Sequence, residues 1–278
     1  MTQPLADARG SARISRFFAR LREEGKKGLI AYITAGDPSP DETVELVLAL
    51  ERGGAGLIEL GVPFSDPVAD GPVIQAASER SLKAGTTLRK VLGLATEIRR
   101  QSEVPLLLFS YLNPILRYGL EPLARDAAAA GVDGCLITDL SVEEAGSYVD
   151  VMRSHNLDTV FLAAPTSTPR RLQLVAKYST GFVYLVSRTG VTGERESLSA
   201  ALAPLLASMR KVTQLPLAVG FGISTPEQVR QVGELADAVV VGSAFVRLIG
   251  RNIGVASLPL QLETLARELK HGFEMKGA

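Results

Sequence analysis

The segment LIELGVPFSDPVADG, residues 57–71, places Glu59 inside an apolar run and then brings Asp66 and Asp70 in a loop with two prolines. An apolar run of this kind is typical of a strand that is buried on both faces of a parallel sheet. In α/β barrels, the polar residues that follow such strands carry the chemistry. The segment therefore predicts a buried strand and raises the question of why that strand carries a carboxylate.

Seven further runs of short, β-branched or apolar residues share this character. The eight expected strands are GLIAYITAG (28–36), GLIELG (56–61), PLLLFSYLN (105–113), GCLITDL (134–140), TVFLAAP (159–165), GFVYLVS (181–187), PLAVGFG (216–222) and DAVVVGSAF (237–245). Helical spacing of apolar residues predicts helices at 41–53, 73–101, 121–130, 142–155, 169–178, 197–213, 226–234 and 256–272. Strands that alternate with helices indicate a parallel sheet covered by helices.

Eight such units predict closure into a (β/α)8 TIM barrel, and 278 residues allow one barrel to use the whole chain, 1–278, as a single domain. An open doubly wound sheet is the alternative. The segment TAGDPSPDE (34–42) after the first strand has one glycine, so it lacks the glycine-rich turn that binds dinucleotides in open sheets. The barrel is the favoured fold.

An extra amphipathic helix is expected before the barrel, because Ile14, Phe17, Phe18 and Leu21 share one helical face. Packing against the core is favoured over a role at a membrane surface. The first 27 residues contain no apolar stretch suited to a signal peptide or a membrane span. We therefore expect a cytoplasmic protein without membrane contact.

Charge and cysteine content exclude two further classes. Thirty basic residues balance thirty acidic ones without long runs of either sign, which argues against a nucleic-acid partner. The single cysteine, Cys135, cannot form an internal disulfide and lies in an expected strand, so a structural role is favoured.

The carboxylate of Glu59 is expected to point into the barrel, on the strand face that it shares with Leu57 and Gly61. Burial of an unpaired carboxylate raises its pKa, which suits proton transfer near neutral pH. The alternative is a structural ion pair with a buried Lys or Arg. None of the eight strand cores has such a residue before its carboxyl end, so a functional role is favoured.

A cation site is a second possibility for the same carboxylates. Glu59, Asp66 and Asp70 offer oxygen ligands of the kind that divalent cations prefer. The two histidines, His155 and His271, lie away from the expected strand ends, which argues against a transition-metal site.

Glycine-bearing segments end the last three expected strands, namely SRTGVTGE (187–194), GFGISTPE (220–227) and VGSAF (241–245). Glycines let backbone N–H groups approach an anion, and a helix N-terminus adds partial positive charge. These segments predict a ligand whose phosphate group is held by the main chain. The first of them is also expected to act as a lid.

Six segments together resemble the family of tryptophan synthase alpha subunits. They are LIELGVPFSDPVADGPVIQ, AYITAGDP, YLNPILRYG, YLVSRTGVTG, VGFGIS and VVVGSAF, in family order over about residues 28 to 250. The resemblance implies a lyase of tryptophan biosynthesis that cleaves indole-3-glycerol phosphate to indole and glyceraldehyde 3-phosphate. It implies retro-aldol acid and base catalysis without a bound cofactor or metal.

The resemblance also implies roles for individual residues. Glu59 would be the acid and base at indole C3 and the glyceryl hydroxyl, and Asp70 would accept the indole N–H. The residues implied to line the substrate pocket are Tyr32, Tyr111, Leu136, Tyr184 and Thr192, the last of which would bond Asp70 when the lid closes. Those implied to hold phosphate are Gly193, Gly222, Gly242 and Ser243.

A partner follows from the same resemblance. The family works with a beta subunit that carries pyridoxal phosphate, in an α2β2 assembly, and the loop with Asp66 would face that partner. Three alternatives stay open: a stand-alone lyase, which activity without a beta subunit would reveal; a metal-dependent aldolase, which a chelator would inhibit; and a non-catalytic binding subunit. The presence of both Glu59 and Asp70 argues against the last.

Overall fold

The computed structural model describes residues 11–186, 198–220 and 222–275. Its nine parallel strands are β1 (Gly28–Thr34), β2 (Leu57–Gly61), β3 (Leu106–Ser110), β4 (Gly134–Ile137), β5 (Asp158–Val160), β6 (Leu162–Ala163), β7 (Val183–Val186), β8 (Leu217–Gly220) and β9 (Ala238–Val241). They form one sheet in the order β5-β4-β3-β2-β1-β9-β8-β7-β6.

The barrel is closed through the fifth expected strand, which is divided into β5 and β6. β5 pairs with β4 and β6 pairs with β7, and only Phe161 separates the two short strands. Eight barrel strands therefore come from nine segments, and the predicted (β/α)8 barrel is confirmed.

Alternation along the strands separates two apolar layers. Leu57 of β2 and Leu107 of β3 belong to a cluster inside the barrel, whereas Ile58 and Leu60 belong to the larger cluster that packs against the helices. Burial on both faces explains why the strands read as nearly continuous apolar runs.

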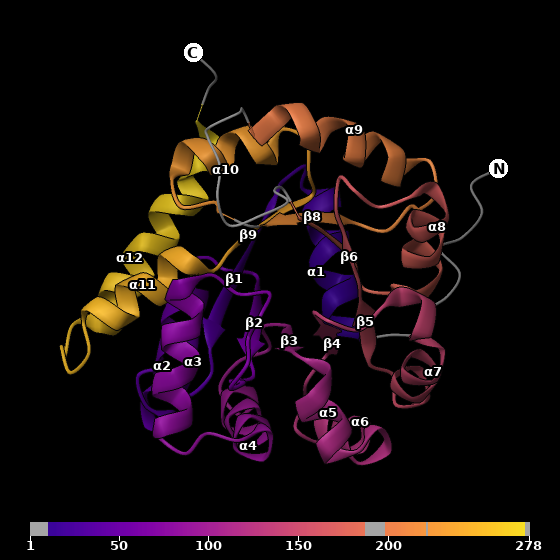
Figure 1. Cartoon of the computed structure of the whole chain (residues 1–278). Coiled ribbons are helices and arrows are strands. Elements are labelled where there is room, and N and C mark those ends of the chain that lie inside the picture. The colour runs from indigo at the N-terminus through magenta and orange to yellow at the C-terminus, as the bar shows by residue number, and fades with distance from the viewer. Residues whose placement is uncertain (1–10, 187–197, 221, 276–278) are drawn as a thin grey trace.

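Helices form a ring around the strands (Figure 1). They are α2 (Pro40–Arg52), α3 (Pro72–Lys83), α4 (Leu88–Arg99), α5 (Leu112–Tyr118), α6 (Leu120–Ala129), α7 (Gly146–Ser154), α8 (Pro169–Tyr178), α9 (Leu198–Arg210), α10 (Pro226–Gly233), α11 (Ser243–Arg251) and α12 (Leu258–His271), with 3-10 turns η1 (Val142–Glu144) and η2 (Gly272–Glu274). Within the described residues, none of the helices is long and apolar enough to cross a bilayer.

Three features of the helical layer differ from the prediction. The helix expected at 73–101 is two helices, because Gly85 adopts a φ of 75° and Thr87 caps the start of α4. α5 and α11 were not predicted, since each begins within residues that were assigned to the preceding strand.

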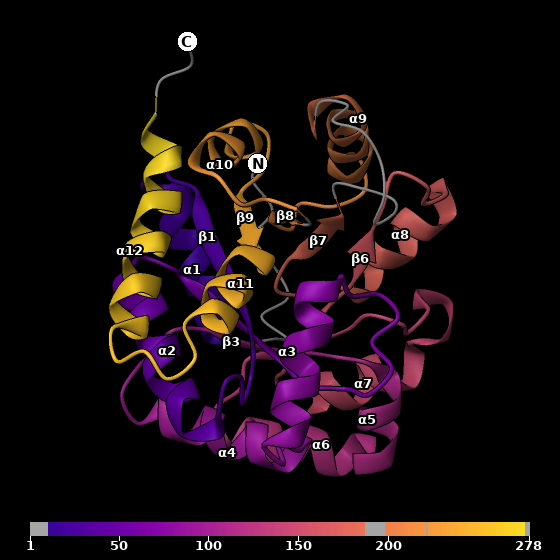
Figure 2. The same cartoon turned by 60° about the vertical axis from the view of Figure 1, so that its left-hand side comes forward.

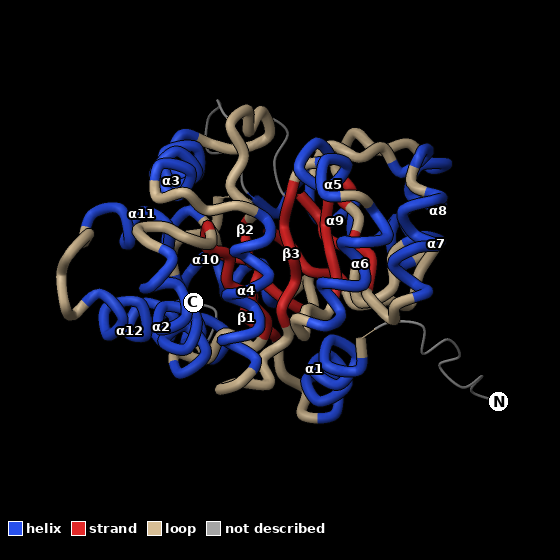
Figure 3. Tube along the Cα trace, turned by 90° about the horizontal axis from the view of Figure 1, so that it is seen from below, coloured by secondary structure: helices blue, strands red, loops and turns tan. Residues whose placement is uncertain are grey.

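The N-terminal helix α1 (Ala12–Glu23) covers the amino-terminal end of the barrel, as Figure 3 shows from below. Ile14, Phe17 and Phe18 are buried in the cluster inside the barrel, and the rings of Phe18 and Phe182 lie 5.6 Å apart. The prediction that this helix packs against the core is confirmed.

Candidate active site

Glu59, the middle residue of β2, lies inside the barrel. In the sheet register, Glu59 lies between Tyr32 of β1 and Leu107 of β3, and Leu57 on the same strand face lies in the interior cluster. The inward direction that alternation predicted is therefore confirmed.

Glu59 is completely buried, and neither carboxylate oxygen has a hydrogen-bond partner among the described residues. No Lys or Arg side chain among the described residues lies within ion-pair distance of the Glu59 carboxylate. Burial raises the pKa of Glu59 to about 8. The side chain is therefore mostly protonated at neutral pH, and none of the described residues forms the structural ion pair that was considered from the sequence.

Asp70 is the second carboxylate of the site and ends the loop between β2 and α3. The Tyr111 hydroxyl donates a hydrogen bond of 3.0 Å to Asp70 Oδ2 and accepts one of 3.0 Å from the Ala69 N–H. Burial raises the pKa of Asp70 to about 6, although the bond from Tyr111 opposes that rise. The two carboxyl groups thus differ, and Asp70 ionises at lower pH than Glu59.

Aromatic side chains line the same interior space. The ring of Phe109 lies 5.2 Å from that of Tyr32 and 6.5 Å from that of Tyr184, measured between centroids. Burial and the nearby carboxylates of Glu59 and Asp70 raise the pKa of Tyr184. The structure therefore brings both carboxylates and the tyrosines together.

Leu136 on β4 is fully buried in the interior cluster that contains Tyr32 and Tyr184. Phe109 belongs to that cluster as well, yet the sequence analysis did not select it. It lies two residues before Tyr111, so the strand alternation that identified Glu59 would also have identified Phe109.

Two glycines at strand ends were also missed. A Cβ atom on Gly61 would collide with the hydroxyl of Tyr32, and one on Gly220 would collide with the hydroxyl of Tyr184. Each glycine leaves room for a tyrosine from the neighbouring part of the barrel. No local pattern in the sequence indicates these contacts.

Three of the four residues expected to bind phosphate follow β8 and β9. Gly222 lies after β8, Gly242 precedes the first turn of α11, and Ser243 is its first residue. Gly242 also packs against Tyr32, since a Cβ there would lie 3.3 Å from Tyr32 Cβ. The N-terminus of α11 therefore adjoins the aromatic lining of the site.

Part of the predicted site lies outside the described residues. Thr192 and Gly193 belong to this part, as does the whole of the expected lid at 188–196.

Asp66 lies apart from the buried carboxylates. It is exposed, and its Oδ2 accepts a hydrogen bond of 2.5 Å from the hydroxyl of the adjacent Ser65. Within the described ranges, no three His, Cys, Asp or Glu side chains are close enough together to hold a metal ion. The cation site considered for Glu59, Asp66 and Asp70 is therefore not assembled.

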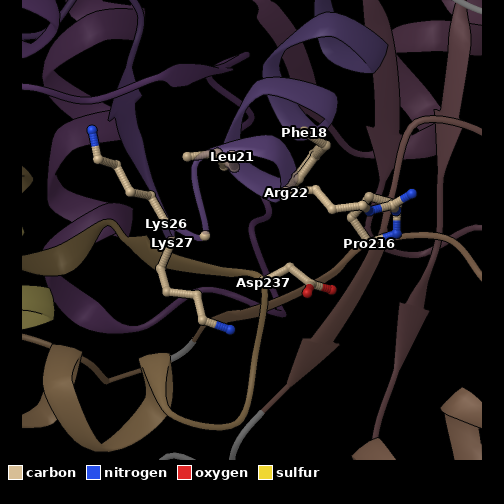
Figure 4. A pocket seen from close by; sticks show the side chains of 8 residues that line it. Phe18, Leu21, Arg22, Lys26, Lys27, Pro216 and Asp237 are labelled. Carbon is tan, nitrogen blue, oxygen red and sulfur yellow. The ribbon is translucent and has the colours of Figure 1, made fainter.

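A separate pocket of about 220 Å³ lies at the opposite end of the barrel (Figure 4). Its lining comes from α1, from the segment before β1 and from the residues that precede β8 and β9, including Phe18, Lys27, Pro216 and Asp237. Lys27 is bonded to the Ala236 carbonyl oxygen at 2.8 Å. This pocket contains none of the predicted site residues.

Known proteins of one family are similar to this chain over nearly its whole length. The family model described as "Tryptophan synthase alpha chain" matches residues 18–274. A tryptophan synthase alpha chain from Solibacter usitatus is 70% identical over 94% of this chain and 98% of that protein. One from Geobacter sp. (strain M21) is 49% identical over 96% of this chain and 99% of that protein.

Solved structures show the same relationship. The tryptophan synthase subunit alpha from Legionella pneumophila superimposes with a TM-score of 0.86 at 37% identity, covering 94% of this chain and 98% of that one. A chain of Mycobacterium tuberculosis tryptophan synthase has a TM-score of 0.86 at 36% identity, with 96% and 100% covered. The chain therefore belongs to the tryptophan synthase alpha chain family.

Proposed function

We propose that Glu59 and Asp70 carry the proton transfers of the alpha reaction, in which indole-3-glycerol phosphate is cleaved to indole and glyceraldehyde 3-phosphate. Cleavage of that carbon–carbon bond needs a proton on indole C3, a proton acceptor at indole N1 and a base for the glyceryl hydroxyl. The observation that carries the proposal is the burial of Glu59 without a hydrogen-bond partner among the described residues.

Glu59 starts the reaction in its protonated form, which its pKa of about 8 favours at neutral pH. It donates this proton to indole C3, and its carboxylate then takes the proton of the glyceryl hydroxyl as the bond to indole breaks. Asp70, with a pKa of about 6, is ionised; it takes the indole N1 proton when C3 is protonated and returns it to N1 as the carbon–carbon bond breaks. The Tyr111 hydroxyl holds the Asp70 carboxylate in place.

The remaining residues bind the substrate. Tyr32, Tyr111, Leu136 and Tyr184 would line the indole pocket, and Thr192 in the lid would form a hydrogen bond with Asp70 on closure. Phosphate is held by backbone N–H groups at Gly193, Gly222, Gly242 and Ser243, where the N-terminus of α11 contributes partial positive charge. No cofactor or metal takes part in this scheme.

The beta subunit is the partner that this proposal assigns. The loop with Asp66 faces the beta subunit, which carries pyridoxal phosphate and receives the indole. The assembly is α2β2 and lies in the cytoplasm. Residues 1–278 act as one barrel domain.

The test is cleavage of indole-3-glycerol phosphate by the purified chain and by Glu59→Gln, with and without a beta subunit and EDTA. We expect slow indole formation that EDTA does not affect and that the partner accelerates. Loss of the proton-transferring group should lower kcat by at least about 100-fold. Glu268→Gln, at an exposed position on α12, is the control and should retain full activity.

Three results would contradict the proposal in different ways. A near-normal rate for Glu59→Gln would exclude the assigned mechanism. Inhibition by EDTA would favour the metal-dependent aldolase, and fast cleavage without a partner would favour the stand-alone lyase.

A further inference from the structure

Arg80 of α3 forms a two-point ion pair with Asp37 in the loop between β1 and α2. Arg80 Nε lies 2.7 Å from Asp37 Oδ1, and Nη2 lies 2.9 Å from Oδ2. Asp37 is completely buried, and the Arg80 side chain is 30% exposed. Two parallel, charge-assisted bonds fix both the distance and the orientation of the guanidinium group.

The next residue of α3 binds the same loop. The Ser81 hydroxyl donates a hydrogen bond of 2.6 Å to the Ala35 carbonyl oxygen, and both residues are fully buried. Consecutive side chains therefore attach α3 to the loop that follows β1.

Arg80 also contacts α11. A Cβ atom on Gly250 of α11 would lie 3.0 Å from Arg80 Nη2, so the guanidinium packs directly against that helix. α3 and α11 lie side by side, as Figure 2 shows. One side chain thus touches two elements besides its own.

The N-terminal ends of α3 and α11 adjoin the residues to which the proposed function assigns substrate binding. α3 begins at Pro72, two residues after Asp70, and α11 begins at Ser243. The indole and phosphate ends of the substrate are assigned to these two helix starts. Their relative position therefore sets where the indole N–H lies with respect to Asp70.

We propose that Arg80, through its paired bonds to Asp37 and its contact with α11, is a positioning residue that fixes Asp70 relative to the phosphate-binding end of α11. It does not touch the substrate. This inference rests on the proposed function, because it concerns the geometry of the same site. Small misplacements of catalytic groups are costly, and about 1 Å can reduce a rate by roughly 100-fold.

Arg80→Lys is the test variant, because lysine keeps the charge but cannot form the two parallel bonds. We expect kcat for indole-3-glycerol phosphate cleavage to fall at least about tenfold. The inhibition constant of glycerol 3-phosphate, which probes the phosphate site alone, should change by less than about twofold. A displaced α3 also weakens the Tyr111 bond to Asp70, so the acid limb of the kcat/KM profile should move to higher pH.

Arg99→Lys is the matched control. Arg99 Nη2 pairs with the buried Asp133 Oδ2 at 3.1 Å, and the Arg99 side chain is 12% exposed. This pair lies at the amino-terminal end of the barrel, since Asp133 precedes β4 and binds the Leu106 N–H. We expect Arg99→Lys to lower Tm without a change in kcat or in the acid limb.

The proposal is overturned if both lysine variants lose activity only in proportion to the folded fraction, or if Arg80→Lys keeps a normal kcat and acid limb. Should Arg80→Lys not fold, Asp37→Asn removes one of the same two bonds and is expected to show the same split. Asp70→Asn separates the two proposals. If it keeps the acid limb, the role assigned to Asp70 fails, whatever Arg80 does.

Discussion

The burial of Glu59 has a consequence for the stability of the fold. Its pKa in the folded chain, about 8, lies above its ordinary value of 4.5, so the folded state binds this proton more tightly than the unfolded state does. Stability from this group is therefore complete below pH 4.5 and is lost as the pH rises to about 8. At about 1.4 kcal/mol per pH unit, the loss is up to about 5 kcal/mol.

We therefore predict that Glu59→Gln becomes more stable relative to the natural chain as the pH rises. The amide cannot ionise, so the difference in unfolding free energy should grow by several kcal/mol between pH 5 and pH 9. Urea unfolding at both pH values measures it, and the exposed Glu268→Gln should show no such trend. A difference that is independent of pH would mean that Glu59 ionises normally in the folded protein.

The individual residues of the site were predictable to different extents. Glu59 and Asp70 are visible in the sequence, because carboxylates are unusual beside a buried strand. Phe109 follows the same alternation as Glu59 but has no polar group to mark it. The pair of Arg80 and Asp37 joins residues 43 positions apart, and no local period can indicate such a contact.

At the scale of the elements, the strands were the more predictable part. Each strand is a short apolar run buried on two sides, so composition alone marks it. Helix boundaries failed where apolar spacing continued through a turn, as at Gly85, or where a strand assignment extended too far, as at Ser243. The spacing of apolar residues indicates which face of an element is buried. It does not indicate the single residue at which the chain turns and the element ends.

α1 supplies a test of how independent the two ends of the barrel are. Phe18 is 5% exposed and packs against Phe17 and Phe182, at the end of the barrel opposite to Glu59. We predict that Phe18→Ala lowers the unfolding free energy by about 3 to 5 kcal/mol through loss of buried surface and formation of a cavity. Because the site residues come from other elements, kcat below Tm should stay within about twofold.

The exposed Arg16→Ala on the same helix is the control and should change the unfolding free energy by less than about 0.5 kcal/mol. Denaturant unfolding and steady-state kinetics on the same samples measure both quantities. A drop in kcat for Phe18→Ala while the chain is fully folded would show that α1 affects the catalytic end.

At the scale of the whole molecule, the mouth of the barrel that holds the site also exposes apolar side chains. Val68 in the loop after β2 is 84% exposed, and Leu116 on α5 is 57% exposed. Asp66 lies in the same loop as Val68. The proposed beta-subunit interface would bury these apolar side chains.

We predict that Leu116→Glu weakens the response to a beta subunit without changing the chain itself. In the free chain the new carboxylate is solvated, so stability and basal cleavage of indole-3-glycerol phosphate should stay close to those of the natural chain. In the complex the carboxylate would be buried without a partner. At least about ten times more beta subunit should therefore be needed for half-maximal activation, which corresponds to about 1.4 kcal/mol.

Leu260→Glu is the matched control, because Leu260 is 62% exposed on α12, away from this mouth. Equal activation curves for the two variants would place the partner on another face of the barrel.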